Sequence, residues 1–253
     1  MSGNCPEMSR IPIWRTTMAE SSYHLPEAAE PAYHRTKAAE PVFPLLSLAR
    51  LRMGTDGNGI TTLVAGAGCP LRCRFCINQE ILRKKPGSMV SPEGLLERVE
   101  IDDLYFRATG GGVTFGGGES LLHAAFIRSF RDLCPSEWKI RTETSLAVPK
   151  ENVRIAAAAA DEFIVDCKEL DPDRYYAYTG GDVSLMTDNL GLLLDLVGPQ
   201  RIIVRVPLIP GFNTVSDRDK NARILQDMGF EKLDLFEYVI RKNSGNDDSP
   251  QIF

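Results

Sequence analysis

The sequence predicts an α/β fold, a partial (β/α)6 barrel of the TIM type, from three observations. Short strands rich in β-branched residues alternate with amphipathic or alanine-rich helices over most of the chain. Strands joined in this way run parallel, because a connecting helix returns the chain to the same end of the sheet. About six such units can be counted, fewer than the eight of a closed barrel. With 253 residues, 43% of them hydrophobic and 25% charged, the chain is large enough to bury its own core.

We expect a mostly irregular or extended N-terminal arm over residues 1–44, followed by the barrel domain over residues 45–253. The arm contains six prolines and shows neither a helical nor an alternating apolar period. Tyr23-His24 and the Ala-Ala-Glu-Pro that follows recur ten residues later from Tyr33-His34, but two copies are too few for a repeat fold. The arm could lie extended on the barrel, form a disordered leader or dock a partner.

Each element of the barrel domain has a local signal in the sequence. The β-branched run 60–64 is the first strand, and Ser91 caps a helix that has proline at its first position and an acid in its first turn. The later helices have apolar residues at helical spacing or many alanines, and Gly198 and Gly229 end two of them. The remaining strands are expected at 112–115, 139–145, 162–167, 201–207 and 232–238, and the remaining helices at 121–133, 149–160, 185–197 and 216–228. Ligands of such sheets bind at the carboxyl ends of the strands.

Three cysteines, Cys69, Cys73 and Cys76, follow the first strand with the spacing C-x3-C-x2-C. Three thiolates on one tight loop can hold three irons of a [4Fe–4S] cluster and leave the fourth iron open for chemistry. A zinc site or an ordinary ferredoxin cluster needs a fourth ligand, whereas the other three cysteines lie singly and far apart in the sequence. The spacing therefore favours an open iron–sulfur cluster, and a non-catalytic iron–sulfur or zinc module is the alternative.

An aromatic residue, Phe75, stands directly before the third cysteine, and with it the motif resembles that of the radical S-adenosylmethionine (radical SAM) enzymes. The resemblance implies that the three cysteines are metal ligands and catalytic residues, and that the Phe75 ring covers the adenine of S-adenosylmethionine. It also implies that the methionine group of this cofactor chelates the open iron. An electron from an external donor of the flavodoxin or ferredoxin type would then cleave the cofactor to methionine and a 5′-deoxyadenosyl radical. No second cysteine group follows before residue 110, so one cluster is expected.

Residues 110–119, Gly-Gly-Gly-Val-Thr-Phe-Gly-Gly-Gly-Glu, contain six glycines in ten positions. Glycine lets the backbone approach a ligand closely, and the lysine and hydroxyl of a phosphate loop are absent from this segment. The segment resembles the Gly-Gly-Glu segment of radical SAM enzymes, which implies that Gly117, Gly118 and Glu119 receive the methionine amino group. The longer match resembles one subgroup of that family, the glycyl radical enzyme activating enzymes.

Three further segments resemble the same subgroup. The stretch Thr-Glu-Thr-Ser around Glu143 stands where the subgroup has Asp-Thr-Asn-Gly, which implies that Glu143 and Ser145 contact the ribose. Arg205 begins a match to Arg-x-x-x-x-Pro-Gly, in which the arginine helps to hold the cofactor. Asp166 and Lys168 match an Asp-x-Lys strand end and are expected on the side of the substrate or partner, although such charges also form structural ion pairs at a barrel mouth.

The resemblance implies an enzyme that takes a hydrogen atom from a glycine of a partner glycyl radical enzyme. Thr61 stands where the subgroup has an arginine, and modification of a ribosomal peptide or a small molecule is the alternative reaction. The net charge of −5 argues against general nucleic-acid binding, which needs a basic face. No apolar run approaches the ~20 residues that span a bilayer, and the start of the chain lacks a secretion pattern. We therefore expect a cytoplasmic enzyme with a protein or peptide substrate and without nucleic-acid or membrane partners.

Overall fold

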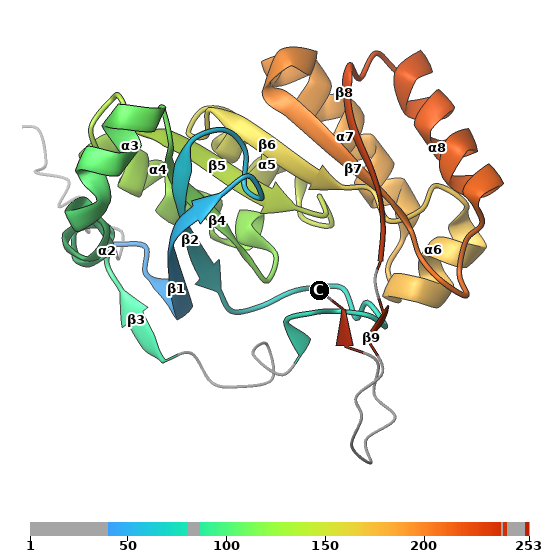
Figure 1. The fold of residues 1–253 in the computed structure, drawn as a ribbon, viewed down its shortest axis with the longest axis horizontal. Helices are drawn as coiled ribbons and strands as arrows, with labels where there is room; N and C mark the ends of the chain where they lie inside the picture. The colour runs from blue at the N-terminus through green and yellow to red at the C-terminus, as the bar shows by residue number, and fades with distance from the viewer. Residues whose placement is uncertain (1–39, 80–86, 239, 242–250, 253) are drawn as a thin grey trace, which may run out of the picture. The chain divides into compact units, whose positions relative to one another are not determined.

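The computed structural model describes residues 40–79, 87–238, 240–241 and 251–252 (Figure 1). Most of the expected N-terminal arm lies outside the described residues, and so do Cys5 and the Tyr-His repeat. The sites and elements discussed below all belong to the described ranges.

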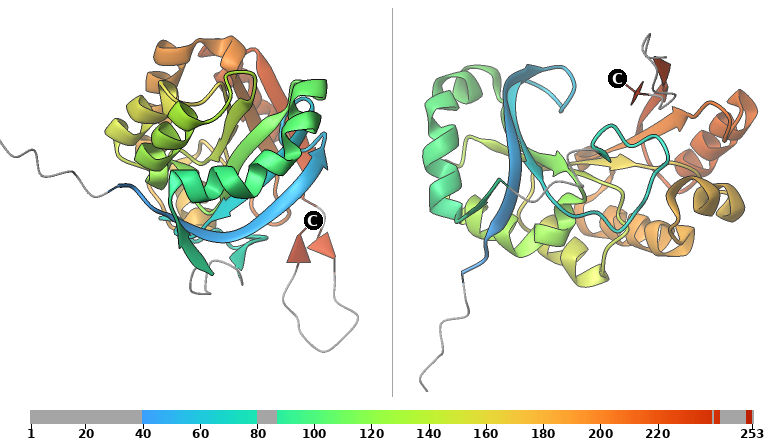
Figure 2. Two further views of the ribbon diagram at one scale, coloured as in Figure 1. Left: turned by 90° about the vertical axis from the view of Figure 1, so that its left-hand side faces the viewer. Right: turned by 90° about the horizontal axis from the view of Figure 1, so that it is seen from below.

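The fold is built on one sheet of eight strands in the order β3-β1-β2-β4-β5-β6-β7-β8. Six of them, β2 and β4 to β8, run parallel, whereas β1 and β3 extend one edge of the sheet antiparallel. The strands are β1 Phe43–Met53, β2 Ile60–Gly66, β3 Ser88–Val90, β4 Gly112–Gly117, β5 Lys139–Thr144, β6 Glu162–Asp166, β7 Ile202–Leu208 and β8 Lys232–Glu237, with a separate ladder of β9 Ile240–Arg241 and β10 Gln251–Ile252. Within the described residues no ladder joins β8 to β1 or β3, so the curved sheet is an open, partial barrel (Figure 2).

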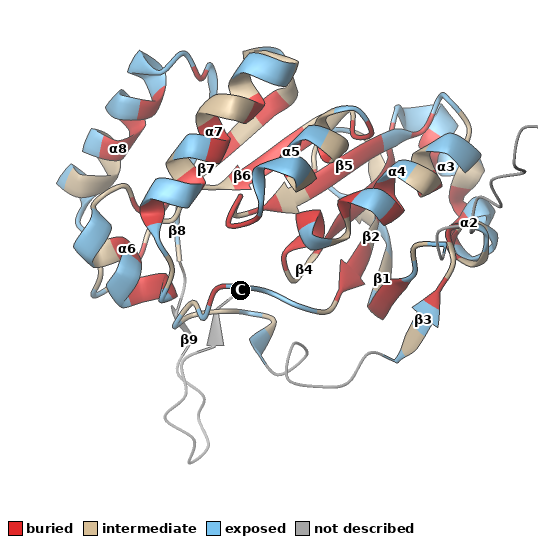
Figure 3. Ribbon diagram, turned by 180° about the vertical axis from the view of Figure 1, so that it is seen from behind, coloured by how far each residue is buried: buried red, intermediate tan, exposed pale blue. Residues whose placement is uncertain are grey.

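The helices cover one face of this sheet and bury its apolar side chains (Figures 1 and 3). They are α2 Pro92–Val99, α3 Asp103–Thr109, α4 Ala124–Leu133, α5 Lys150–Ala157, α6 Pro172–Thr179, α7 Val183–Val197 and α8 Val215–Asp227, with the 3-10 turns η1 Glu100–Asp102, η2 Ser120–His123 and η3 Pro199–Arg201. In the core the Phe115 ring meets Phe43 and Phe130 edge to face, with centroids 5.7 and 5.5 Å apart. The described helices include none that combines the length and apolar character needed to cross a membrane.

Six parallel strands alternating with helices confirm the predicted fold class, with small differences at the ends of the helices. The helix expected at 121–133 begins with the 3-10 turn η2, because the Glu119 carboxylate accepts a hydrogen bond from the Leu121 N–H and caps that turn. The helix expected at 149–160 ends at Ala157.

Four elements, β1, β3, α3 and α6, were not predicted. Strand β1 lacks a clean alternation because two irregularities shift its register against β2, and Leu51 takes the left-handed conformation with φ 55°. Helix α6 is short and rich in tyrosine, and it begins at the Asp171 cap and ends at Gly180. Strand β3 and helix α3, with 3 and 7 residues, carry too little apolar period to stand out in a sequence.

A buried carboxylate ties the antiparallel edge to the barrel. Asp102 accepts hydrogen bonds from Arg50 Nε of β1 at 2.9 Å and from Thr62 Oγ1 of β2 at 2.7 Å. Burial alone would raise the pKa of Asp102, but the Arg50 and Thr62 hydrogen bonds outweigh burial and lower it. The Asp102 side chain is fully buried and Arg50 is partly exposed, so this ion pair holds β1 against β2.

Candidate active site

The carboxyl ends of the parallel strands open into a cavity of about 650 Å³. All twelve residues that the sequence predicts for the site line this cavity. They are Cys69, Cys73, Phe75, Cys76, Gly117, Gly118, Glu119, Glu143, Ser145, Asp166, Lys168 and Arg205. Neighbouring strands of a parallel sheet end at the same edge, which is why residues so far apart in the sequence meet here.

The cysteine loop, residues 68–76, is held on both sides by backbone hydrogen bonds. On one side, the Gly118 N–H donates to the Gly66 carbonyl at 3.0 Å and the Glu119 N–H donates to the Gly68 carbonyl at 2.8 Å. A Cβ on Gly118 would lie 2.2 Å from the Gly68 carbonyl oxygen, so only glycine permits this approach.

On the other side, the cysteine loop is fixed to the end of α6. The N–H groups of Arg72 and Arg74 donate to the Thr179 and Tyr178 carbonyls at 2.7 and 3.1 Å. These bonds satisfy carbonyls that the last turn of a helix leaves without an intrahelical partner. Helix α6, which the sequence did not reveal, therefore positions the three cysteines.

The three thiols are free, and their arrangement suits a cluster better than a single ion. Cys69 is exposed, and Cys73 and Cys76 are partly exposed to the cavity. Among the described residues no three His, Cys, Asp or Glu side chains converge tightly enough to hold one metal ion. Burial raises the pKa of the partly enclosed Cys73 thiol to about 11, so this thiol stays protonated at neutral pH until a metal displaces the proton. Ligands of a [4Fe–4S] cluster bind separate irons and need no such convergence.

The Phe75 ring rests on an aromatic base made by two other elements. It meets the Phe212 ring edge to face with centroids 5.7 Å apart, and the Tyr178 ring at 6.2 Å. The Tyr178 and Phe212 rings contact each other at 5.0 Å, and the Arg74 guanidinium lies 5.4 Å from the Phe212 centroid. This packing fixes the Phe75 ring at the wall of the cavity.

The Glu119 carboxylate is saturated by hydrogen bonds from its own chain. Oε1 accepts from Leu121 N and from Thr144 Oγ1 at 2.6 Å, and Oε2 accepts from Ser145 N at 2.8 Å and Ser145 Oγ at 2.6 Å. Burial raises the pKa of Glu119, although these hydrogen bonds oppose the shift. Each oxygen has two lone pairs, so Glu119 holds the end of β5 against the end of β4 rather than offering a free oxygen to a ligand.

Two ion pairs line the far wall of the cavity. Arg205 Nη1 lies 2.9 Å from Glu143 Oε1, and Arg205 Nη2 donates to the Thr55 carbonyl at 2.5 Å. Burial raises the pKa of Glu143, and the positive charge of Arg205 opposes this without cancelling it. Lys168 Nζ lies 2.9 Å from Asp166, and the negative charge of that aspartate keeps the pKa of Lys168 above its ordinary value despite burial.

The turn between β1 and β2, residues 54–59, contributes a further ion pair that the sequence did not predict. Arg52 donates to Asp56 through Nε at 2.6 Å and Nη2 at 2.9 Å, and Thr61 Oγ1 lies 3.2 Å from the same carboxylate. Thr61 occupies the position where the resembled subgroup has an arginine. Here Arg52, nine residues earlier on β1, supplies a guanidinium beside Asp56.

Other lining residues also went unpredicted, among them Asn78, Tyr178, Asp234, Phe236 and Tyr238. The Asn78 amide donates to the Gly117 carbonyl at 2.7 Å, and the Tyr238 hydroxyl lies 3.1 Å from Lys168 Nζ. The only sequence signal for Tyr238 is a partial match to a late Pro-Tyr-His of the subgroup.

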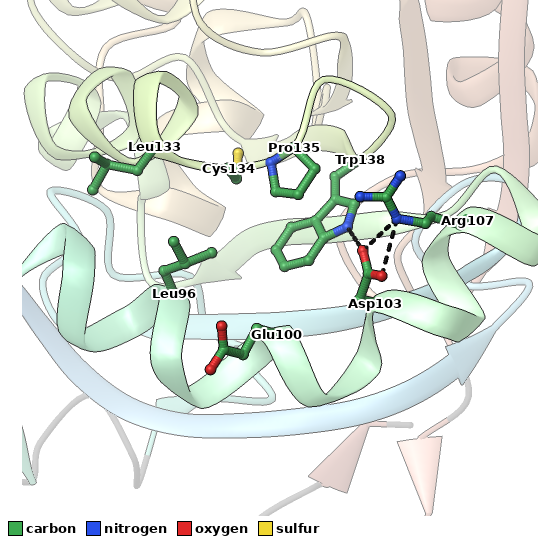
Figure 4. Close-up of a pocket in the computed structure, with 8 residues that line it drawn as sticks. All are labelled: Leu96, Glu100, Asp103, Arg107, Leu133, Cys134, Pro135 and Trp138. Carbon is green, nitrogen blue, oxygen red and sulfur yellow. Dashed lines mark hydrogen bonds and ion pairs between the residues drawn. The ribbon is translucent and has the colours of Figure 1, made fainter.

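A second cavity, of about 500 Å³, is lined by Cys134 and by none of the three cysteines of the loop (Figure 4). Two of its charged groups, Asp103 and Arg107, pair with each other: Asp103 accepts from Arg107 Nε at 2.7 Å and also from Trp138 Nε1 at 2.7 Å. This arrangement is structural, since it joins α3 to the segment before β5.

The profile of the radical SAM superfamily matches residues 63–231, two thirds of the chain and the whole span from β2 to the start of β8. The chain belongs to the radical SAM superfamily. As a radical SAM enzyme it uses a [4Fe–4S] cluster and S-adenosylmethionine, which sets aside the non-catalytic alternative.

Among curated relatives, the pyruvate formate-lyase-activating enzyme of Clostridium pasteurianum is 29% identical over 72% of this chain and 77% of its own length. The pyruvate formate-lyase 2-activating enzyme of Escherichia coli is 30% identical over 66% of this radical SAM chain and 67% of its own. The choline trimethylamine-lyase activating enzyme of Oleidesulfovibrio alaskensis is 29% identical over 72% and 79% of the two chains. These matches confirm the resemblance to activating enzymes predicted from the sequence.

Solved structures of other radical SAM enzymes share the fold. SuiB of Streptococcus suis bound to S-adenosylmethionine superposes with a TM-score of 0.56 at 12% identity, covering 73% of this chain and 41% of SuiB. A TYW1 structure superposes with a TM-score of 0.51 at 15% identity, covering 76% of this chain and 68% of its own. At these identities the likeness concerns the partial barrel alone.

Proposed function

We propose that this radical SAM enzyme activates a partner glycyl radical enzyme by removing a hydrogen atom from one of its glycines. The observation that carries the proposal is the set of relatives named above, each of which is an activating enzyme of a lyase. Their matches extend over 66–72% of the chain, far beyond the cysteine motif.

The residues around the cavity fit the two cofactors of the family. Cys69, Cys73 and Cys76 would hold three irons, and the ring of Phe75 would cover the adenine. When bound, the cluster and S-adenosylmethionine supply the electron and the 5′-deoxyadenosyl radical that takes the hydrogen atom. Gly117 carries no side chain, so the cofactor would be able to approach the backbone of the cavity wall closely at this residue.

The remaining predicted residues would orient the cofactor and the substrate. Glu143 and Arg205 present paired charges beside the cofactor, and Ser145 stays in place through Glu119. Lys168 and Asp166 form the adjoining pair, which we assign to the substrate side. A hydrogen on a glycine Cα suits this enclosure, because no side chain blocks its approach and the flanking amides stabilise the radical.

The other partners follow from the same chemistry. In the described residues the cysteines outside the loop, Cys134 and Cys167, are buried singly, so we propose that an external donor of the flavodoxin or ferredoxin type supplies the electron. Five free thiols and an open cluster suit a reducing compartment, and we propose the cytoplasm.

The test is electron paramagnetic resonance on anaerobically reconstituted enzyme, with a reductant, S-adenosylmethionine and a candidate glycyl radical enzyme chosen from the genes beside this chain. We expect a glycyl doublet that disappears when the target glycine becomes alanine. Each of the changes Cys69→Ala, Cys73→Ala and Cys76→Ala should abolish formation of 5′-deoxyadenosine. Full cleavage activity in any of these variants would disprove the ligand assignment.

Peptide modification is the second candidate, favoured by Thr61 in place of the subgroup arginine. A covalent mass change in a short co-encoded peptide, without a persistent radical, would decide for this reaction.

A further inference from the structure

Strand β8 forms an edge of the sheet, and its backbone polar groups divide cleanly between two sides. The Tyr238 N–H donates to the Leu208 carbonyl of β7 at 3.0 Å. Because the polar groups of successive residues point to opposite sides of a strand, those of Asp234 and Phe236 also face β7. The N–H and carbonyl groups of Leu233, Leu235 and Glu237 therefore point to the opposite side, where no described strand pairs with β8.

This edge is regular enough to serve as a template. Its register with β7 runs without a shift from Lys232 to Glu237. Natural edge strands discourage further pairing by short length, a bulge, a proline or charged side chains, lysine above all. β8 has no proline and no bulge, and its one lysine stands at its first position. Of its two acids, Asp234 lines the cavity and Glu237 ends the strand, so the centre of the free edge is Leu235, which is 46% exposed.

The same strand forms a wall of the active-site cavity. Side chains alternate along a strand, and Asp234, Phe236 and Tyr238 all line the cavity. A strand added beyond β8 would continue this wall, and every second residue of it would face the cavity. The added strand would pair with the backbone groups of Leu233, Leu235 and Glu237, whose side chains lie on the face of the sheet away from the cavity.

We propose that the free edge of β8 binds an extended segment of the protein substrate as an added strand. The proposal rests on the function proposed above and names how that substrate is held. Main-chain pairing recognises an extended peptide without reading its sequence. A glycine on the inward side of the added strand would present its Cα–H to the cavity with no side chain between.

A proline substitution in β8 distinguishes backbone pairing from side-chain contact. Leu235→Pro removes an N–H that faces the free edge and none that pairs with β7, and edge positions of this kind tolerate proline. Leu235→Ala removes the side chain but keeps the N–H, so it is the matched control. In both variants melting temperature, iron content and cleavage of S-adenosylmethionine by the reduced enzyme alone should match the unchanged protein.

The candidate glycyl radical enzyme chosen from the genes beside this chain is the probe, with radical formation followed by electron paramagnetic resonance. We expect Leu235→Pro to raise the KM for this partner roughly tenfold, because it loses one hydrogen bond to the added strand and its ring obstructs the pairing. Leu235→Ala should change the KM less than about twofold. Equal KM values for Leu235→Pro and the unchanged enzyme would overturn the proposal, as would equal losses in both variants. Absence of any radical with the unchanged enzyme would instead refute the proposed function, and this inference with it.

Hydrogen exchange on the unchanged enzyme tests the edge without any variant. The Leu233, Leu235 and Glu237 amides should exchange fast in the enzyme alone and roughly tenfold more slowly with saturating partner. Protection already present in the enzyme alone would show that a second copy or another part of this chain occupies the edge. That result, or unchanged exchange while the radical forms, would overturn the proposal.

Discussion

The approach of Gly118 to the cysteine loop allows a quantitative test of how the site is assembled. In Gly118→Ala the new Cβ would lie 2.2 Å from the Gly68 carbonyl oxygen and 3.0 Å from that of Gly66. Ordinary contact begins near 3.4 Å, so the two backbones must separate by about 1 Å. The separation weakens two hydrogen bonds, from Gly118 N to Gly66 and from Glu119 N to Gly68.

The cost can be estimated from these contacts. Overpacking of a tight site costs about 1–3 kcal/mol, and each weakened hydrogen bond adds about 0.5–1.5 kcal/mol. We expect a loss of about 2–6 kcal/mol, which for a chain of this size lowers the melting temperature by roughly 4–24 °C. Because the moved segment carries the cysteines, iron bound after anaerobic reconstitution should fall well below the four atoms of a cluster.

The control is Gly191→Ala in α7, where a new Cβ would meet nothing within 4 Å. That change should raise stability by up to about 1 kcal/mol, because alanine favours a helix over glycine, and leave the iron content unchanged. A Gly118→Ala protein with the melting temperature and iron content of the unchanged protein would refute the reasoning. It would mean that the cysteine loop does not depend on its contact with the end of β4.

Three further changes test other parts of the structure. Arg205→Ala should weaken S-adenosylmethionine binding about tenfold to a hundredfold in calorimetry while iron content is kept, and unchanged affinity would show that the strand is wrongly assigned. Phe212→Ala should remove the base under the Phe75 ring and speed loss of the cluster in a chelator assay, whereas equal rates would mean that this packing is unimportant. Asp102→Asn should cost about 1–3 kcal/mol in urea unfolding at pH 7. The pKa of Asp102 in the folded protein lies below its ordinary value of 3.8. Its contribution to the free energy of unfolding is therefore present above that pH and is lost as the pH falls further. The variant and the unchanged protein should converge in stability in acid, and a constant difference between them would contradict the ion pair.

The cofactor side of the cavity was predictable from the sequence because its residues stand in short motifs at strand ends. The cysteine spacing, the glycine segment and the strand-end charges each occupy ten residues or fewer. The parallel topology then brings them to one edge. This is why all twelve predicted residues line one cavity although they span residues 69 to 205.

The backbone just after β5 has a feature that the sequence does not reveal. Directly after the predicted residue Ser145, Leu146 takes the left-handed conformation that glycine favours, with φ 58°. A leucine gives no signal for this conformation, so only the structure could show it. The assignment of Glu143 and Ser145 to the ribose stays a prediction.

Five of the residues that the sequence missed share a location rather than a chemical type. Asp234, Phe236 and Tyr238 lie on or just after β8, and Arg52 and Asp56 lie on β1 and the turn after it, so these residues come from elements at the two sides of the open sheet. A motif that binds a common cofactor must keep its residue types and spacing, whereas walls that meet different substrates need only keep their place in the fold. Thr61, which stands where the resembled subgroup has an arginine, lies beside the Asp56 carboxylate that Arg52 also contacts. Substrate choice in this enzyme is therefore to be sought on β8 and on the β1–β2 turn, where only a structure reveals which residues face the cavity.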